Sequence, residues 1–272
     1  MTRKLSEPTM QRMTSAHRLS SILALVALSA TGTILFQSKA AEPTNDKPDG
    51  SSAGSFPRLG NTENPEAKLT TAADALAGMK LPDGFTISLF ASEPDVNQPI
   101  ALATDDRGRL WVAENYTYAE RATNFDDTMR DRIVILEDED HDGKFDKRTE
   151  FWDQGRRLTS VEIGYGGVWV LDAPNLLFIP DKNEDDVPDG EPVVMLDGWD
   201  DDAVRHNIVN GLRWGPDGWL YGRHGIMATS LVGRPGATPD QRRALNCCVW
   251  RFHPTKHTFE VVCEGTTNSW GM

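Results

Sequence analysis

The 272-residue sequence has little cysteine and no block of basic residues. Three cysteines are too few for a scaffold built on disulfides. The 28 Lys and Arg are outnumbered by 41 Asp and Glu, and a net charge of −13 without clustered cations argues against nucleic acid as a partner. The sequence also lacks the Cys-x-x-Cys-His motif, which excludes an attached c-type haem from this chain. An apolar content of 39% is nevertheless enough for a folded core.

The N-terminus has the pattern of an export signal. Basic residues precede an apolar run from Ile22 to Phe36, and Ser38-Lys39-Ala40 follows as a small-x-small site. We therefore predict a signal peptide over residues 1–40, cleaved after Ala40, and a periplasmic or envelope-associated protein. The alternative is an uncleaved anchor, although the run is short for a membrane span of roughly 20 residues.

Residues 41–78 are rich in Pro, Gly, Ser and charge and predict a disordered linker that ends in a short amphipathic turn, 72–79. From residue 79 to 272 the pattern is all-β. Four segments have strand composition between Gly, Pro, Asp and Asn residues: 85–90, 132–136, 176–179 and 248–252.

A repeated motif assigns these strands to a fold class. A glycine is followed three residues later by an aromatic residue in Gly108–Trp111, Gly166–Trp169 and Gly218–Tyr221. The aromatic residues lie 58 and 52 residues apart, which is typical of β-propeller blades with four strands each. We predict about three blades of an incomplete ring, over 81–152, 158–196 and 208–263, with residues 264–272 leading into a fourth.

The meander within a blade sorts the loops onto two ends of the sheets. The first face receives the loops between second and third strands and between blades, at 114–130, 154–159, 197–207 and 223–245. The second face receives the turns between third and fourth strands, at 138–146 and 181–189.

The first face gathers residues suited to proton transfer and anion binding. Arg205-His206-Asn207 precedes one expected strand and Arg223-His224 ends the next, while Arg121 lies in the long loop of blade one. Histidine can accept a hydroxyl proton, and arginine can bind carboxylates with two hydrogen bonds. The alternative is structural: both histidines stabilise turns, and Arg205 pairs with the acidic run 200–202.

The second face carries an acidic loop with calcium-site spacing. Asp138, Asp140, Asp142 and Asp146 stand at positions 1, 3, 5 and 9, with Gly143 at position 6. We predict a structural calcium site there, and a weaker one at 181–190, where the glycine at position 6 is missing. The alternative is a pair of solvated acidic turns.

Four motifs, taken together, resemble a known family: Leu81-Pro-Asp-Gly-Phe85, Asp106-Arg-Gly-Arg-Leu-Trp-Val-Ala-Glu114, the acidic hairpin from Arg132 to Lys144, and Asn210-Gly-Leu-Arg-Trp-Gly-Pro-Asp-Gly-Trp-Leu-Tyr-Gly222. They look like the N-terminal propeller of the membrane-bound dehydrogenases of planctomycete and verrucomicrobial bacteria. That family is similar to the soluble glucose and sorbosone dehydrogenases, six-bladed propellers that use pyrroloquinoline quinone (PQQ).

The resemblance implies a site on the first face. His206 would take the substrate's hydroxyl proton while hydride passes to PQQ, and His224, by its position on the same face, is a second candidate catalytic histidine. Arg223, Arg205, Arg121 and Asn207 would hold the cofactor. The sequence departs from the pattern at Arg205, where the relatives usually have an acidic residue.

Two functions follow as expectations. The first is an exported quinoprotein-type dehydrogenase that oxidises a sugar or other alcohol, with a downstream cytochrome c as possible acceptor; this chain alone would be an inactive fragment. The alternative is a non-catalytic propeller that binds carbohydrate or protein within a larger protein. A calcium-dependent lactonase is disfavoured, because it needs acidic ligands in the central funnel rather than on the second face.

Overall fold

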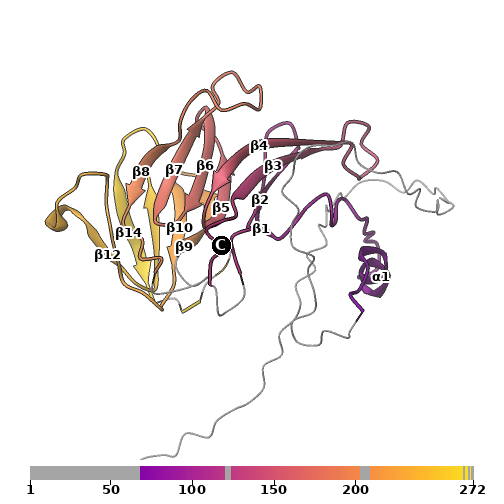
Figure 1. Ribbon diagram of the computed structural model, residues 1–272, viewed down its shortest axis with the longest axis horizontal. Helices are drawn as coiled ribbons and strands as arrows, with labels where there is room; N and C mark the ends of the chain where they lie inside the picture. Colours follow the sequence, from indigo (N-terminus) through magenta and orange to yellow (C-terminus); the bar gives the residue numbers. More distant parts are fainter. Residues whose placement is uncertain (1–67, 120–123, 203–208, 266, 269, 271–272) are drawn as a thin grey trace, which may run out of the picture.

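The computed structural model describes residues 68–119, 124–202, 209–265, 267–268 and 270. These residues form an all-β structure of three four-stranded antiparallel sheets, which lie side by side in chain order (Figure 1). Blade one comprises β1 (Pro99–Thr104), β2 (Leu110–Glu114), β3 (Asp131–Glu137) and β4 (Lys147–Gly155). Blade two comprises β5 (Leu158–Ile163), β6 (Gly167–Asp172), β7 (Asn175–Pro180) and β8 (Val193–Asp197). Blade three comprises β9 (Val209–Trp214), β10 (Leu220–His224), β13 (Cys248–Phe252) and β14 (Phe259–Glu264).

Three small elements complete the described chain. A separate two-stranded sheet, β11 (Ser230–Val232) and β12 (Arg243–Leu245), extends from the loop between β10 and β13. The 3-10 helix η1 (Pro239–Gln241) lies in the same loop, and helix α1 (Ala72–Gly78) precedes the sheets. Among the described residues, no helix is long and apolar enough to cross a membrane.

The repeated glycine-aromatic motif closes the first turn of each blade. The glycine adopts a positive φ in every copy, 79° at Gly108, 77° at Gly166 and 77° at Gly218. The aromatic side chain then donates back to its own turn: Trp111 Nε1 to Asp105 Oδ2 at 3.0 Å, Trp169 Nε1 to the Gly164 carbonyl at 3.0 Å, and Tyr221 OH to Asp217 Oδ2 at 2.8 Å. Each of these hydrogen bonds closes its turn, and in the first two copies it also satisfies the N–H group of a buried indole, which explains why the motif recurs.

Apolar side chains fill the spaces between neighbouring sheets. The sequence of strand β3 contains a continuous run of apolar residues, because both faces of this strand are covered by other parts of the protein. Ile133 and Ile135 pack between blades one and two, while Val134 contacts a smaller cluster with Ala91 and Val96. A second large cluster, centred on the buried Trp169, Trp199 and Trp250, lies between blades two and three. The innermost strands β1, β5 and β9 are therefore held side by side.

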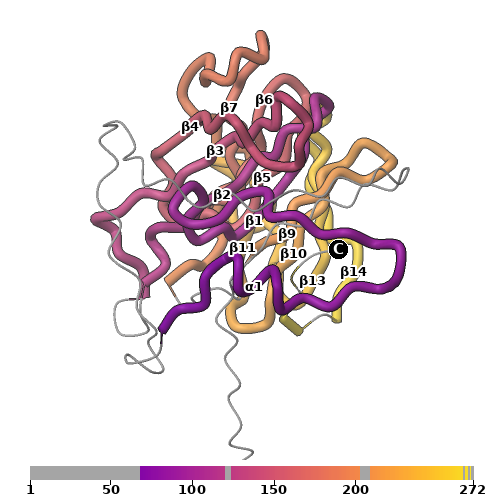
Figure 2. The backbone as a smooth tube through the Cα atoms, turned by 90° about the vertical axis from the view of Figure 1, so that its right-hand side faces the viewer, coloured from indigo at the N-terminus to yellow at the C-terminus, as the bar shows by residue number. Residues whose placement is uncertain are grey.

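The predicted blades are confirmed as sheets, with corrected ends. Blade one was expected from residue 81, but its sheet begins at Pro99 and ends at Gly155. The segment 85–90 is not a strand, because no described strand forms a hydrogen-bonded ladder with it. It belongs to the segment between α1 and β1, which crosses the outer side of blade one (Figure 2). The described sheets do not show a closed ring.

The N-terminal predictions are met only at the end of the linker. The predicted turn at 72–79 is helix α1, whose Thr71 side chain accepts a hydrogen bond from Asp74 N at 3.1 Å. This helix lies inside the range 41–78 that was expected to be disordered. The predicted signal peptide, 1–40, and most of the linker lie outside the described residues.

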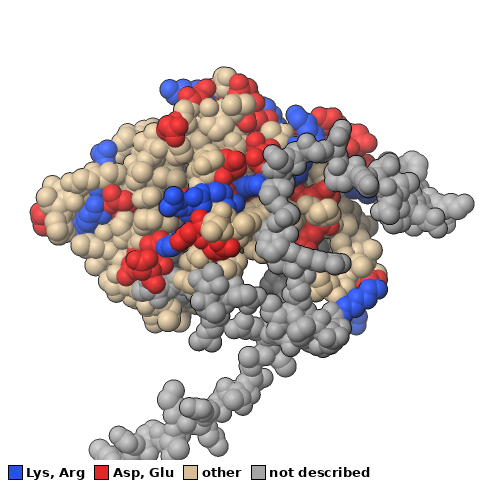
Figure 3. Space-filling view, viewed as in Figure 1, with Lys and Arg blue, Asp and Glu red and all other residues tan. Residues whose placement is uncertain are grey.

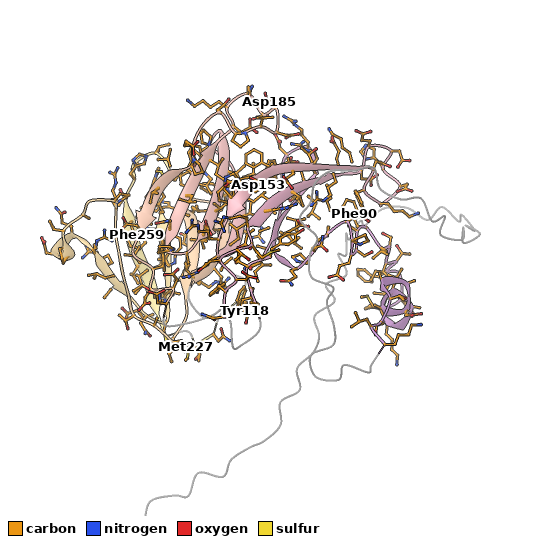
Figure 4. The ribbon with its side chains drawn as sticks, in the orientation of Figure 1. Phe90, Tyr118, Asp153, Asp185, Met227 and Phe259 are labelled. Atoms are coloured by element: carbon orange, nitrogen blue, oxygen red, sulfur yellow. The ribbon has the colours of Figure 1, made fainter. Side chains whose placement is uncertain are left out.

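The two predicted faces are present. The loop after β10 and the turn after β7 lie at opposite ends of the sheets, as the labels Met227 and Asp185 show (Figure 4). The turns between first and second strands share the second face with Asp185, because each follows a strand that runs away from the first face.

Candidate functional site

Polar side chains gather where the innermost strands of blades two and three meet the first face. Thr159 lies near the start of β5, and Asn210 lies near the start of β9. Their exposed fractions are 7% and 2%, and within the described part of the structure neither Thr159 Oγ1 nor Asn210 Oδ1 has a hydrogen-bond partner. A buried polar group left without a partner costs about 1–3 kcal/mol. Two such atoms on adjacent inner strands indicate a place prepared for a polar ligand or water.

Arg223 brings a positive charge to the same place. It pairs with Asn210 across the β9–β10 ladder and is 2% exposed. Its guanidinium group lies where a side chain at residue 211 would stand, and Gly211, with a φ of 67°, leaves the space open. Burial lowers the pKa of Arg223 from its ordinary value, yet arginine remains protonated at neutral pH.

His224 is at the predicted position but is enclosed. It is fully buried, with Nδ1 2.7 Å from the Gly225 carbonyl and Nε2 2.8 Å from Ser230 Oγ. Since a carbonyl only accepts, Nδ1 carries the proton and Nε2 accepts from Ser230. Burial lowers the pKa of His224, against smaller raising effects of Gly225 and Asp200, which favours this neutral form. Both ring nitrogens are thus occupied, and the catalytic role of His224 stays a prediction.

Arg157, in the loop between blades one and two, forms an ion pair with the acidic run 200–202. Asp201 forms an ion pair with Arg157, whose guanidinium group lies 4.8 Å from the Phe125 ring centre. Asp200 N donates to Ser230 Oγ at 2.9 Å, which connects the same run to His224. The expected partner, Arg205, lies outside the described residues, as do His206, Asn207 and Arg121.

Two buried carboxylates accept hydrogen bonds from the segments that connect blades one and two. Asp131 accepts from Thr117 N at 2.8 Å and Leu158 N at 2.9 Å, and Asp172 accepts from Arg157 N at 2.6 Å. Burial raises the pKa of Asp131 to about 6, against the lowering effect of its hydrogen bonds. Their hydrogen bonds to main-chain N–H groups identify both carboxylates as structural.

Sequence reasoning missed Glu162, which lies on the innermost strand β5. It is 6% exposed, and Arg213 Nη1 of the neighbouring strand β9 stands 3.2 Å from its Oε1. Burial raises the pKa of Glu162 to about 7, although Arg213 lowers it. The residues around Glu162 in the sequence do not predict its burial, because that burial depends on packing against blade three.

The predicted calcium loop brings three of its four proposed ligands together. Carboxylate oxygens of Asp138, Asp140 and Asp146 all lie within 4.8 Å of one another. The fourth, Asp142, does not join the group, and its Oδ1 accepts from Lys144 N at 2.8 Å. The convergent donors are oxygen atoms, which calcium prefers.

The second acidic loop is neutralised by arginines instead. Arg109 donates from Nη1 and Nη2 to the two carboxylate oxygens of Asp186, at 2.7 and 2.9 Å. Its Nε donates to Asp105 at 2.8 Å, and Arg107 Nη2 donates to Glu184 at 3.1 Å. Among the described residues, this loop contains no group of three carboxylates close enough to share an ion.

Comparisons with known proteins place the chain in a family. Residues 71–272 match the profile of a domain of unknown function, DUF7133. The chain belongs to the DUF7133 family. The match covers helix α1, the three four-stranded sheets and the small sheet β11–β12 of this DUF7133 chain. No curated protein sequence is significantly similar to it.

The solved structures that are similar to the DUF7133 chain share little sequence with it. A nidogen/laminin complex shares 13% identity over 68% of this chain and 71% of that chain, with a TM-score of 0.38. A virginiamycin B lyase from Staphylococcus aureus shares 12% identity over 62% of this chain and 56% of that one, with a TM-score of 0.33. A protein assigned as a 6-phosphogluconolactonase from Bacteroides uniformis shares 13% identity over 65% of this chain and 58% of that one, with a TM-score of 0.34. The DUF7133 chain thus spans less than two thirds of the lyase and lactonase chains.

Proposed function

We propose that the chain belongs to an exported propeller of quinoprotein dehydrogenase type, which oxidises a sugar or other alcohol at the first face. The observation that carries the proposal is the group formed by Thr159, Asn210 and Arg223 at the ends of adjacent strands. It offers neutral hydrogen-bonding groups beside a buried positive charge. Such a group suits a ligand, or a ligand pair, that presents hydroxyl and carboxylate groups close to each other.

PQQ fits the chemistry of this group. It carries carboxylates, and Arg223 is the described residue that would hold one of them, because a buried guanidinium group favours an anionic partner. When bound, PQQ supplies the acceptor for the hydride that leaves the alcohol carbon. The chain's own part is to bind the substrate hydroxyl through Asn210 and Thr159 and to remove its proton, for which His206 remains the proposed base.

The proposal is tested by catalysis in the full-length gene product. The protein is supplied with PQQ and calcium, and reduction of a redox dye is followed across a panel of sugars and simple alcohols. We expect turnover of at least one substrate, and a fall of about 100-fold or more in kcat for His206→Ala. No turnover with any substrate, together with unchanged PQQ binding in His206→Ala, would contradict the proposal.

Replacement of Asn210 tests the described part of the site. Asn210→Leu keeps the size of the side chain but removes its hydrogen-bonding atoms, so we expect ligand affinity to fall about tenfold, because a ligand group is left unpaired. Isothermal titration with the active sugar measures this, or with PQQ if no sugar is active. Thr258→Val, an exposed change in the turn between β13 and β14, is the control and leaves affinity unchanged. Equal ligand affinity in wild type and Asn210→Leu would show that the Asn210 amide does not bind the ligand.

One observation favours the alternative, a propeller that binds carbohydrate or protein without redox chemistry. Both ring nitrogens of His224 are engaged in hydrogen bonds, so this histidine offers no free base in the described structure. The same dye assay separates the two functions. Sugar binding that is lost in Asn210→Leu, without dye reduction under any condition, would establish the alternative.

We also propose that Asp138, Asp140 and Asp146 bind calcium and stabilise the hairpin between β3 and β4. At a calcium concentration of about 100 times Kd, the folded state gains about 2.7 kcal/mol, and we expect Tm to rise by about 5–10 °C. Asp140→Asn should abolish the rise, whereas Asp142→Asn, outside the convergent group, should keep it. Differential scanning calorimetry with calcium or EDTA measures both. Equal loss in the two variants, or no rise in the wild type, would contradict the site.

A further inference from the structure

A cavity of about 300 Å³ opens on the second face, at the seam between blades one and two. The turns β1–β2 and β5–β6 and the turn after β7 form its walls. It lies at the opposite end of the sheets from the proposed dehydrogenase site. The intermixed acidic and basic side chains around the loop after β7 are visible at the top of the space-filling view (Figure 3).

The cavity is built on a rigid base. Arg109, 6% exposed, joins Asp105 of its own turn to Asp186 of blade two, and Trp111 Nε1 donates to Asp105 at 3.0 Å. Asp181 follows strand β7 directly, and its N–H donates to the Gly166 carbonyl at 3.0 Å. These contacts hold the walls in place without any ligand, as is usual for small-molecule pockets.

The charges of the lining favour a cation. Five carboxylate and two guanidinium residues line the cavity, for a formal charge of −3. An anion is disfavoured because Arg109 and Arg107 already bind carboxylates. A metal ion is disfavoured because, in the described structure, no three acidic side chains of this cavity converge. An organic cation remains.

Asp181 is the acid of the cavity that such a cation would meet. It is 6% exposed and accepts the N–H of Asp185 at 3.2 Å, but among the described residues no Lys, Arg or His forms an ion pair with it. Burial raises the pKa of Asp181, against the lowering effect of hydrogen bonds from the main-chain N–H groups of Asp185 and Asp186. A buried carboxylate without a counterion is costly, and a bound cation would remove that cost.

Tyr165 adds an aromatic surface to the same cavity. The residue is 53% exposed, has a left-handed backbone with a φ of 58°, and lines the cavity. The ring rests against Trp214, with ring centres 4.9 Å apart, and its hydroxyl donates to the Gly218 carbonyl at 3.1 Å. Tyr165 and Asp181 both line the cavity, so a bound ammonium group can interact with the aromatic ring as well as with the carboxylate.

We propose that this cavity binds a small organic ammonium ion, with Asp181 as its counterion and the Tyr165 ring as its aromatic wall. The volume limits the ligand to a small molecule of the size of choline or an amino sugar. The site is independent of the dehydrogenase proposal, because it lies on the other face and uses none of its residues.

Titration with choline and its uncharged isostere 3,3-dimethylbutan-1-ol tests the proposal. Binding to the full-length protein is followed by saturation-transfer NMR at low salt. We expect choline to bind about tenfold or more tightly than the isostere, since the charge supplies most of the interaction. Asp181→Asn should weaken choline binding by about tenfold, and Tyr165→Leu by about threefold. The exposed Asp153→Asn on β4 makes the same charge change elsewhere and should leave binding unaltered.

Three results would overturn the proposal. The first is equal binding of choline and the isostere. The second is equal loss in Asp153→Asn and Asp181→Asn, which would indicate general attraction to an acidic surface. The third is unchanged choline binding in either Asp181→Asn or Tyr165→Leu, each shown to be folded by its Tm. Because Tyr165 lies at the exposed rim, its variant decides the matter even if Asp181→Asn fails to fold.

Discussion

Arg109→Met should lower the free energy of unfolding by about 3–5 kcal/mol, because it leaves two largely buried carboxylate side chains without their cation. The side chains of Asp105 and Asp186 are only 5% and 14% exposed, and both form ion pairs with Arg109. The hydrogen bond to Asp186 is the largest of the effects that raise the pKa of Arg109. For a folded part of about 200 residues we expect Tm to fall by about 10 °C.

Thermal unfolding of two further variants identifies the cause. Arg107→Met removes an ion pair on the same turn whose partners are 44% and 65% exposed, so it should cost less than about 1 kcal/mol. Adding Asp186→Leu to Arg109→Met should restore part of the loss, because the unpaired charge is then removed. A surface substitution typically changes Tm by no more than about 2 °C. If the Tm of Arg109→Met lies within about 2 °C of the wild-type value, the ion pairs of Arg109 with Asp105 and Asp186 do not stabilise the contact between blades one and two.

Glu162→Gln should remove a large part of the pH dependence of stability. The folded-state pKa of Glu162 is raised to about 7 from 4.5, so the folded protein holds a proton that the unfolded chain has lost. The wild type should therefore lose stability as the pH rises from about 4.5 to 7, by up to about 3 kcal/mol from this group. The glutamine keeps the shape of the protonated acid and should not show this loss.

Urea unfolding at pH 5 and pH 8 measures the effect. The difference between wild type and Glu162→Gln isolates the group from Asp131, whose raised pKa of about 6 acts in the same direction. The control is Glu191→Gln, an exposed carboxyl in the turn between β7 and β8, which should follow the wild type at both pH values. Parallel profiles for wild type and Glu162→Gln would show that Glu162 is solvated in solution.

The sheets were predictable because their signals are local. The glycine-aromatic motif marks each blade, since the glycine turn and the aromatic donor lie within a few residues of each other. The strands 132–136, 176–179 and 248–252 were found from composition alone. The segment 85–90 has the same composition, but a strand also requires a neighbour, which composition does not report.

The candidate site was predictable in position but not in environment. The position of Arg223 and His224 on the first face followed from the meander. The burial of His224 did not, because its partner Ser230 belongs to the small sheet β11–β12, for which the sequence has no clear pattern. The burial of Glu162 likewise depends on Arg213, which lies one blade later. Contacts between distant segments therefore account for most of what was missed.

Equilibrium dialysis of PQQ against the full-length protein tests the first-face site most directly. We expect one PQQ to bind per protein, with affinity about tenfold weaker in Asn210→Leu and Thr159→Val and unchanged in Thr258→Val. That result would place the ligand at the inner strands of blades two and three. Absence of PQQ binding by the wild type, or equal affinity in all four proteins, would contradict the quinoprotein assignment of this site.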